Sequence, residues 1–351
     1  MISVSPPVPR SVSHKRVVLR YVVSAILTLV FLWLAFRGTD VRKLGESLAG
    51  AHYGWILLSV VCLMSSNVVR AWRWRFLLEP IKPGIGLRNL FSGVMIGYFL
   101  NNVLPRAGEL GRPYVMGKLE SISKTAAFGT IVIERLMDTV TFLILVLLIP
   151  FVYDGPLRES FPWLLEGGAI LSAVTAAVLV LLILLMVRRD WTDAMLRLIE
   201  RLMTPAAAQR VNSLVHSFLD GFLFLKHPRR FLAIGVSSVL IWGLYIVMTY
   251  VAFFAFGLEG HLGFGAATVL LAISSIGVAI PTPGSTGSYH VFAAQTLTRL
   301  FSVDGAVALS YATVTHAAGY LAATVFGLYF FVRDQITIAA AVARPGEQGA
   351  P

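Results

Sequence analysis

Long apolar runs are the feature that most limits what this chain can fold into. A transmembrane helix needs about 17–25 mostly apolar residues. Eight runs meet or exceed that length, at 17–36, 53–69, 87–104, 126–150, 163–187, 231–256, 264–300 and 306–332. Only 13% of the residues are charged, against about 25% in soluble domains. The sequence therefore predicts an all-α polytopic membrane protein.

The placement of Lys and Arg predicts the topology. If 88–122 and 264–300 dip into the membrane and return, six helices cross it fully. The cytoplasmic segments then hold 23 of the 29 Lys and Arg residues and the outer segments hold 5, as the positive-inside rule favours. We expect an inner (plasma) membrane protein with both termini cytoplasmic. The net charge of +11 reflects this bias, and we expect no nucleic-acid partner.

The sequence predicts one membrane domain between two terminal tails. We expect a disordered Ser/Pro-rich tail at 1–14, one membrane domain at 15–335 and a disordered tail at 336–351. The domain divides into half one at 15–150 and half two at 163–335. Within half two, 188–230 holds eight Lys and Arg residues and reads as amphipathic helices. These lie either on the inner membrane surface or on the protein's own cytoplasmic face.

The stretch 101–112 combines charges with helix-breaking residues. Proline interrupts the helical ladder, and glycine permits turns and close backbone approach. Irregular backbone at membrane depth persists only where protein buries it or where it lines a cavity. The stretch is therefore predicted to be a re-entrant segment at a functional site, with an ordinary cytoplasmic loop as the alternative.

The second half repeats this pattern. Leu104-Pro-x-x-Gly-x-x-Gly111 and Ile280-Pro-x-x-Gly-x-x-Gly287 are 176 residues apart, and the same offset pairs Gly129 with Gly305. Three crossings in each half place the second copy upside down. Matching Gly/Pro-interrupted segments in two inverted halves point to the central site of a transporter. The expected re-entrant backbone residues are Pro105, Gly108, Gly111, Pro281, Pro283, Gly284 and Gly287.

The run 126–150 carries Glu134, Arg135 and Asp138. Charges at membrane depth need partners, and the two carboxylates, four residues apart, share one helix face. Arg106, Arg112 and Arg135 are the candidate partners. The cluster is either a salt-bridge network that only fixes helix packing, or a polar cavity where arginines bind a phosphate.

These motifs resemble the transmembrane region of lysylphosphatidylglycerol synthases and its stand-alone flippase-like relatives. The resemblance rests on Asn101/Asn102…Leu104-Pro105…Gly108-Glu109…Arg112, on Glu134-Arg135-Leu136-x-Asp138 and on Pro281-x-Pro283-Gly284…Gly287. It covers about residues 20–332. The family often has a Gly-Gly pair and a later Glu in the last motif, where this chain has Gly284-Ser285 and His290. We expect the soluble aminoacyl-transferase chemistry of the synthases to be absent.

The resemblance implies a protein that binds or translocates lipid. We expect a flippase-like protein that moves an anionic or modified (glyco)phospholipid between leaflets, is not an enzyme, and uses no cofactor or metal. The alternatives are a membrane-embedded lipid or polyprenyl-phosphate transferase, and a scaffold for a lipid-modifying synthase. The expected substrate-binding residues are Asn101, Asn102, Arg106, Glu109, Arg112, Glu134, Arg135 and Asp138, with His290 as a secondary candidate.

Two of these expectations concern particular side chains. Arg112 is expected to contact a lipid phosphate, with Glu109 one helical turn away to orient it. His290 and His316, in apolar surroundings, are interpreted as buried histidines with satisfied hydrogen bonds, with a proton carrier as the alternative.

Overall fold

The computed structural model describes residues 14–104, 106–187, 196–197, 203, 205–220 and 228–337. The fold is all-helical (83% helix), and these residues contain no strand. The predicted all-α class is confirmed. Residues 1–13 and 338–351 of the predicted tails, Pro105 and much of 188–230 lie outside the described residues.

Half one begins with the long helix α1 (His14–Phe36), which a bend joins to the short α2 (Val41–Gly50). The Asp40 side chain caps α2 by accepting from the backbone N–H groups of Arg42 and Lys43. The remaining helices of this half are α3 (Tyr53–Leu78), α4 (Leu87–Val103), α5 (Gly108–Glu120) and α6 (Lys124–Val152).

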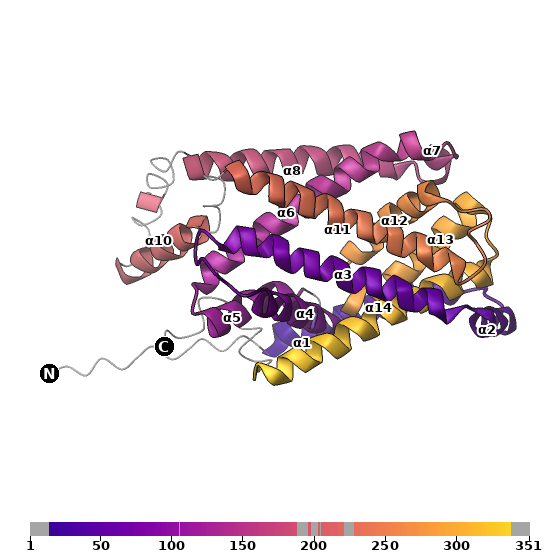
Figure 1. Ribbon diagram of the computed structural model, residues 1–351, viewed down its shortest axis with the longest axis horizontal. Coiled ribbons are helices and arrows are strands. Elements are labelled where there is room, and N and C mark those ends of the chain that lie inside the picture. The colour runs from indigo at the N-terminus through magenta and orange to yellow at the C-terminus, as the bar shows by residue number, and fades with distance from the viewer. Residues whose placement is uncertain are drawn as a thin grey trace.

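Half two has a similar order of elements (Figure 1). After the one-turn helix α7 (Leu157–Ser160), its elements are α8 (Trp163–Val187), α10 (Pro205–Asp220), α11 (Pro228–Phe254), α12 (Phe264–Ala279), the 3-10 turn η2 (Pro283–Ser285), α13 (Ser288–Phe301) and α14 (Gly305–Arg333).

Four of these helices are long and apolar enough to cross a membrane, namely α3, α6, α11 and α14. Taking the bent pair α1 and α2 as one span gives five, and α8 and α12 contain shorter apolar stretches. The chain is therefore a multi-pass integral membrane protein.

Two helical hairpins enter the bundle from opposite ends (Figure 1). Hairpin 1 consists of α4, residues 104–107 and α5, and hairpin 2 of α12, residues 280–287 and α13. In hairpin 1 the two arms touch through glycine, because a Cβ at Gly108 would lie 2.0 Å from the carbonyl oxygen of Gly97. In hairpin 2 a Cβ at Gly277 would lie 2.9 Å from the oxygen of Ser288.

The constant offset of 176 residues is not kept through the turns. It relates the ends of α4 and α12, at Val103 and Ala279, but α5 and α13 begin 180 residues apart, at Gly108 and Ser288. Hairpin 2 has four extra residues in its turn. The pairing of Gly129 with Gly305 is therefore wrong, since Gly129 lies within α6 and Gly305 begins α14.

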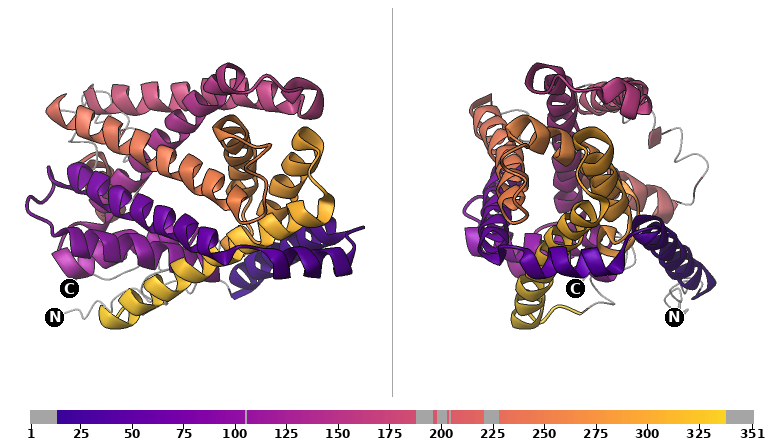
Figure 2. Two further views of the ribbon diagram at one scale, coloured as in Figure 1. Left: turned by 45° about the vertical axis from the view of Figure 1, so that its right-hand side comes forward. Right: turned by 90° about the vertical axis from the view of Figure 1, so that its right-hand side faces the viewer.

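The packing of the two halves is largely reciprocal (Figure 2). Helix α4 packs on α14 and α12 packs on α6, while α3 and α11 pack against each other. Helix α2 lies on α14 and α10 lies on α6, where the rings of Phe128 and Phe218 are 6.3 Å apart. The α10 segment thus packs on the protein itself. The reciprocity fails at α1, which contacts hairpin 2, whereas α8 contacts α6.

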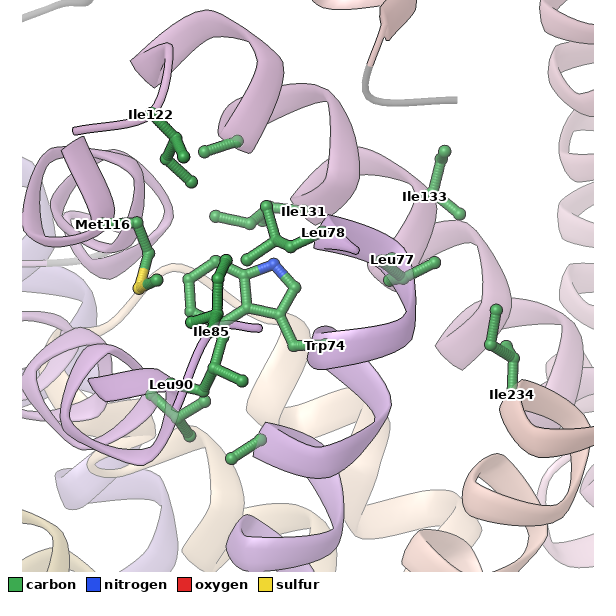
Figure 3. Packing of buried hydrophobic residues seen from close by; sticks show 13 residues of the cluster. Trp74, Leu77, Leu78, Ile85, Leu90, Met116, Ile122, Ile131, Ile133 and Ile234 are labelled. Atoms are coloured by element: carbon green, nitrogen blue, oxygen red, sulfur yellow. The ribbon is translucent and has the colours of Figure 1, made fainter. Parts of the chain in front are cut away.

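A hydrophobic core holds hairpin 1 against α3 and α6. Trp74 is fully buried among Leu78, Met116 and Ile131 (Figure 3), and its indole N–H donates to Thr130 Oγ1 at 2.9 Å. Helix α3 continues to Leu78 instead of ending near residue 69.

The open end of hairpin 1 is closed by Glu120. Its carboxylate accepts from Lys82 Nζ at 2.8 Å and from Asn89 Nδ2 at 2.6 Å. Partial burial acts to raise the pKa of Glu120, but these hydrogen bonds outweigh it and hold the pKa below its usual value. The clamp fixes the beginning of α4 and the end of α5 to the loop after α3.

Candidate functional site

Two arginines of α3 point into the protein. Arg70 and Arg73 are 4% and 0% exposed and share a helix face with Trp74 and Leu77, whereas Trp72 and Arg75 on the other face are exposed. The spacing of three and four residues places these side chains on one stripe of the helix. The stripe faces the charged part of α6.

Glu134 and Asp138 of α6 receive these arginines. Arg70 Nη1 lies 2.7 Å from Glu134 Oε1 and 2.8 Å from Asp138 Oδ2, so one guanidinium bridges both carboxylates. Arg73 Nη2 lies 2.7 Å from Asp138 Oδ1. This bridging relieves the repulsion between two carboxylates that share one face.

Arg112 joins the cluster from hairpin 1. Its Nη1 and Nη2 donate to Oε1 and Oε2 of Glu134 at 3.0 and 2.8 Å, and its guanidinium lies 4.1 Å from the centre of a Trp74 ring. This paired geometry uses the planar fork of Arg. Both terminal nitrogens are thus occupied by Glu134, not by the predicted partner Glu109. Glu109 is half-buried one turn away and makes no hydrogen bond or ion pair within the described chain.

Arg135 is the open member of the cluster. Its Nη2 lies 3.1 Å from Glu134 Oε1 and its Nη1 lies 3.5 Å from Asp138 Oδ2, yet 44% of the side chain is exposed. As the twelfth residue of α6, it lies about 16 Å along the helix, about half the thickness of a hydrocarbon core. An accessible cation therefore sits near the middle of an apolar helix that is long enough to cross a membrane.

These six residues form what we call the arginine cluster, and its positive charges outnumber its negative ones. Within the described residues, the acidic partners of Arg70, Arg73, Arg112 and Arg135 are Glu134 and Asp138 alone. Neutral acceptors supply the rest, since Arg70 donates to the Tyr245 hydroxyl at 3.2 Å and Arg73 to Ser238 Oγ at 2.9 Å. The Nε atoms of the three buried arginines have no hydrogen-bond partner in the described chain.

The predicted residues at the tip of hairpin 1 do not join the cluster. Asn101 Oδ1 accepts from the Gly108 N–H at 2.7 Å and so closes the turn into α5. Asn102 Nδ2 donates to Thr324 Oγ1 of α14 at 2.9 Å. Arg106, with a φ of +61°, is exposed and donates to the Ala279 carbonyl at 3.4 Å. The contacts of Asn102 and Arg106 attach the tip of hairpin 1 to half two.

The turn of hairpin 2 is built from neutral groups. Gly284, Ser285 and Gly287 have positive φ angles of 54°, 60° and 86°. A Cβ on Gly284 would lie 2.5 Å from the Tyr320 ring, so the turn packs closely on α14. Ser24 of α1 donates to the Pro281 carbonyl at 3.2 Å.

Of the residues expected from sequence, Arg112, Glu134, Arg135 and Asp138 are brought together. Arg70, Arg73, Ser238 and Tyr245 were missed. The sequence could have indicated the two arginines, because they recur with Trp74 and Leu77 at helical spacing and so share one helix face with these apolar residues. Ser238 and Tyr245 are contributed by half two, and no local pattern marks them. In the described residues no group of three or more His, Cys, Asp or Glu side chains could hold a metal ion.

The fold and this cluster define a polytopic helical membrane protein with a buried ionic site between its helices. The family model of the lysylphosphatidylglycerol synthase TM region matches residues 17–327. The chain belongs to this family.

Three relatives cover much of the chain. It is 28% identical to a UPF0104 membrane protein of Methanothermobacter thermautotrophicus over 70% of this chain and 75% of the relative. It is 23% identical to the UPF0104 membrane protein PH1989 of Pyrococcus horikoshii, over 87% and 93%. It is also 23% identical to Glycosyltransferase AglD of Haloferax volcanii, over 93% of this chain but only 56% of that protein. No solved structure matches the chain.

Proposed function

We propose that the protein is a flippase-like translocator that binds an anionic or modified (glyco)phospholipid headgroup at the arginine cluster. The observation that carries this proposal is the excess of four guanidinium groups over two carboxylates beside the middle of α6, a helix long enough to cross a membrane. Uncompensated charge in a membrane is costly and marks substrate pathways. A lipid phosphate supplies the missing negative charge.

Arg135 is the residue we assign to direct phosphate contact. It alone among the four arginines is substantially exposed, and its fork-shaped guanidinium suits phosphate oxygens. Arg70, Arg73 and Arg112 act as positioning residues, because their terminal nitrogens hold Glu134 and Asp138. Glu109, which pairs with no cation among the described residues, is assigned to a cationic part of the headgroup.

The proposed topology has six full crossings, two re-entrant hairpins and an inverted repeat, in the inner (plasma) membrane with both termini cytoplasmic. The reciprocal packing of α4 on α14 and of α12 on α6 supports it. The Lys/Arg bias supports it as well, since excluding the buried Arg70, Arg73 and Arg112 leaves 20 cytoplasmic Lys and Arg residues against 5 outside.

Cysteine labelling tests this topology. In a variant whose single Cys62 is replaced by Ser, a cysteine at the exposed His261 should react with an impermeant maleimide from outside intact cells. One at the exposed Arg88 should react only after permeabilisation. The reverse pattern at either position contradicts the proposal.

One comparison favours a second candidate function. AglD, which aligns with 93% of this chain, is named a glycosyltransferase, so a transferase acting on a membrane lipid is the alternative. A transferase makes a covalently changed lipid, whereas a translocator changes only the leaflet in which the lipid resides. Mass spectrometry of the lipids after the transport assay distinguishes the two.

The test of function uses liposomes that contain the purified protein and fluorescent phosphatidylglycerol, with fluorescent phosphatidylcholine as the zwitterionic comparison. Arg135→Gln should slow movement of the anionic lipid at least about tenfold, because a charged hydrogen bond contributes about 1.5–3 kcal/mol. Arg75→Gln, on the exposed face of α3, is the matched control and should leave the rate unchanged. Equal rates for Arg135→Gln and the wild type would remove Arg135 from the site.

A further inference from the structure

Two histidines hold the turn of hairpin 2 from two sides. His290, the third residue of α13, is 5% exposed and accepts at Nδ1 from the Gly287 N–H at 3.3 Å. Nε2 of His316, on α14, lies 2.8 Å from the carbonyl oxygen of Gly284. The centroids of the two rings are 4.7 Å apart. Each ring thus bonds the backbone of the same turn.

The backbone partners fix the tautomer of each ring. A carbonyl oxygen only accepts, so Nε2 of His316 carries the proton and Nδ1 keeps a lone pair. A backbone N–H only donates, so Nδ1 of His290 has the lone pair and Nε2 carries the proton. Nδ1 of His316 makes no hydrogen bond within the described chain. It is the one basic nitrogen of the pair that is open to a proton.

Starting from two neutral rings, the pair can bind one additional proton but not two. Protonation of His290 at Nδ1 places a second donor against the Gly287 N–H and breaks that bond. Protonation of His316 at Nδ1 breaks no bond, and it makes the bond to Gly284 charge-assisted and therefore stronger. Two imidazolium rings at this distance would repel each other strongly. The first proton goes to His316 and excludes a second.

None of the described groups around the pair opposes protonation of His316 in preference to His290. From α14, the ring of Tyr320 packs beside His316. From α13, the ring of Tyr289 packs beside both histidines, and its hydroxyl shares a hydrogen bond with Thr315 at 3.1 Å. Helix α12 and η2 contain no titratable residue. Helix α1 contains none between residues 22 and 36.

Charged groups in the surroundings are few. Helix α7 contacts α13 at its far end, where Phe161 and Leu300 share a core cluster. From hairpin 1 the nearby groups are the Asn102 amide and Arg106, which donates to the Ala279 carbonyl. No ion pair within the described chain includes either histidine, so no carboxylate neutralises a proton bound there.

His316 occupies the same position along α14 as Arg135 does along α6. It is the twelfth residue of the 29-residue α14, as Arg135 is of the 29-residue α6. Half one has a permanent cation at this position and half two has a titratable base. We propose that His290 and His316 form a binding site for a single proton, carried on Nδ1 of His316.

The test is an NMR pH titration, between pH 4 and 8, of the full chain with ¹⁵N-labelled histidine in zwitterionic nanodiscs. His316→Gln keeps a side-chain N–H for the Gly284 carbonyl but cannot take a proton. His290→Asn keeps an oxygen acceptor for the Gly287 N–H. His261→Gln, at an exposed loop position, is the control for loss of an unrelated histidine. The thermal midpoint of each variant checks folding.

We expect His316→Gln to lose one titrating signal that persists in His290→Asn and in the control. Hydrogen exchange of 281–288, corrected for its intrinsic pH dependence, should slow on acidification in the wild type and not in His316→Gln. The proposal would be overturned if His316→Gln keeps every titrating histidine signal of the wild type, or if the signals of His290 and His316 report a doubly protonated pair. None of these measurements depends on lipid movement, so their failure is separate from failure of the proposed function.

Discussion

Hairpin 1 and hairpin 2 have the same arrangement of helices but are held by different forces. Hairpin 1 has a short turn, a Gly97–Gly108 contact between its arms, and Arg112 in a paired salt bridge with the buried Glu134. Hairpin 2 has a longer turn with three positive φ angles, held by neutral hydrogen bonds to His290, His316 and Ser24.

This difference between charged and neutral contacts indicates which hairpin is easier to displace. Breaking a buried ion pair by removing one partner costs about 3–5 kcal/mol, whereas a neutral hydrogen bond contributes about 0.5–1.5 kcal/mol. Hairpin 1 is thus fixed to α6 by charge, and hairpin 2 is attached to α14 by contacts that can be exchanged one at a time.

The largest expected effect comes from Glu134, the eleventh residue of α6. Glu134→Gln removes the shared partner of the arginines and should lower the free energy of unfolding by about 3–5 kcal/mol. Thr315→Val, at the eleventh position of α14, loses the neutral hydrogen bonds of the Thr315 hydroxyl to Tyr289 and to the Tyr311 carbonyl and should cost about 1–2 kcal/mol. Denaturant unfolding in micelles measures both, and equal losses would contradict the comparison.

Arg112→Lys should have the next largest effect. Lysine keeps the charge but cannot form the two parallel bonds to Glu134 or the flat contact with Trp74. We expect a loss of about 1.5–3 kcal/mol in unfolding free energy. Arg75→Lys, exposed on α3, is the control. A fully stable Arg112→Lys with slowed lipid movement would instead favour direct contact of Arg112 with the lipid.

Glycine-to-alanine substitutions in the arms of the two hairpins should have the smallest effects on stability, and these effects should follow the space around each glycine. Gly108→Ala should destabilise by about 1–3 kcal/mol through overpacking against the backbone of Gly97. Gly277→Ala, whose nearest contact is 2.9 Å away, should cost less. Gly243→Ala on α11 meets nothing within 4 Å and should be stabilising by up to about 1 kcal/mol. Thermal midpoints rank the three, and a more damaging Gly277→Ala would reverse the order proposed here.

Much of the fold could be predicted because a membrane restricts the choices. Apolar length identified the helices, and Pro with Gly located both breaks, since these residues disrupt a helix wherever it packs. The exact register across the turns could not be predicted, because four extra residues in the turn of hairpin 2 leave no periodic signal.

The site was predicted in part for similar reasons. Charges within the apolar 126–150 were conspicuous, and a bridging arginine was expected because two carboxylates on one face repel. Arg70 and Arg73 were missed because a basic run at the end of an apolar segment is typical of a membrane boundary. Only the neighbours of α3 decide that this run is buried, and those neighbours come from distant parts of the chain.

The equal lengths of α6 and α14 have a consequence for the bilayer around the protein. A helix of 29 residues is about 43 Å long, while the hydrocarbon core is about 30 Å thick. The excess is accommodated by tilt and by ends that reach the headgroups. Because α10 packs on α6 and α2 on α14, each projecting helix carries a short neighbour. Longer acyl chains thicken the hydrocarbon core and reduce this excess, so the thermal stability of the protein should rise with acyl-chain length in reconstituted vesicles.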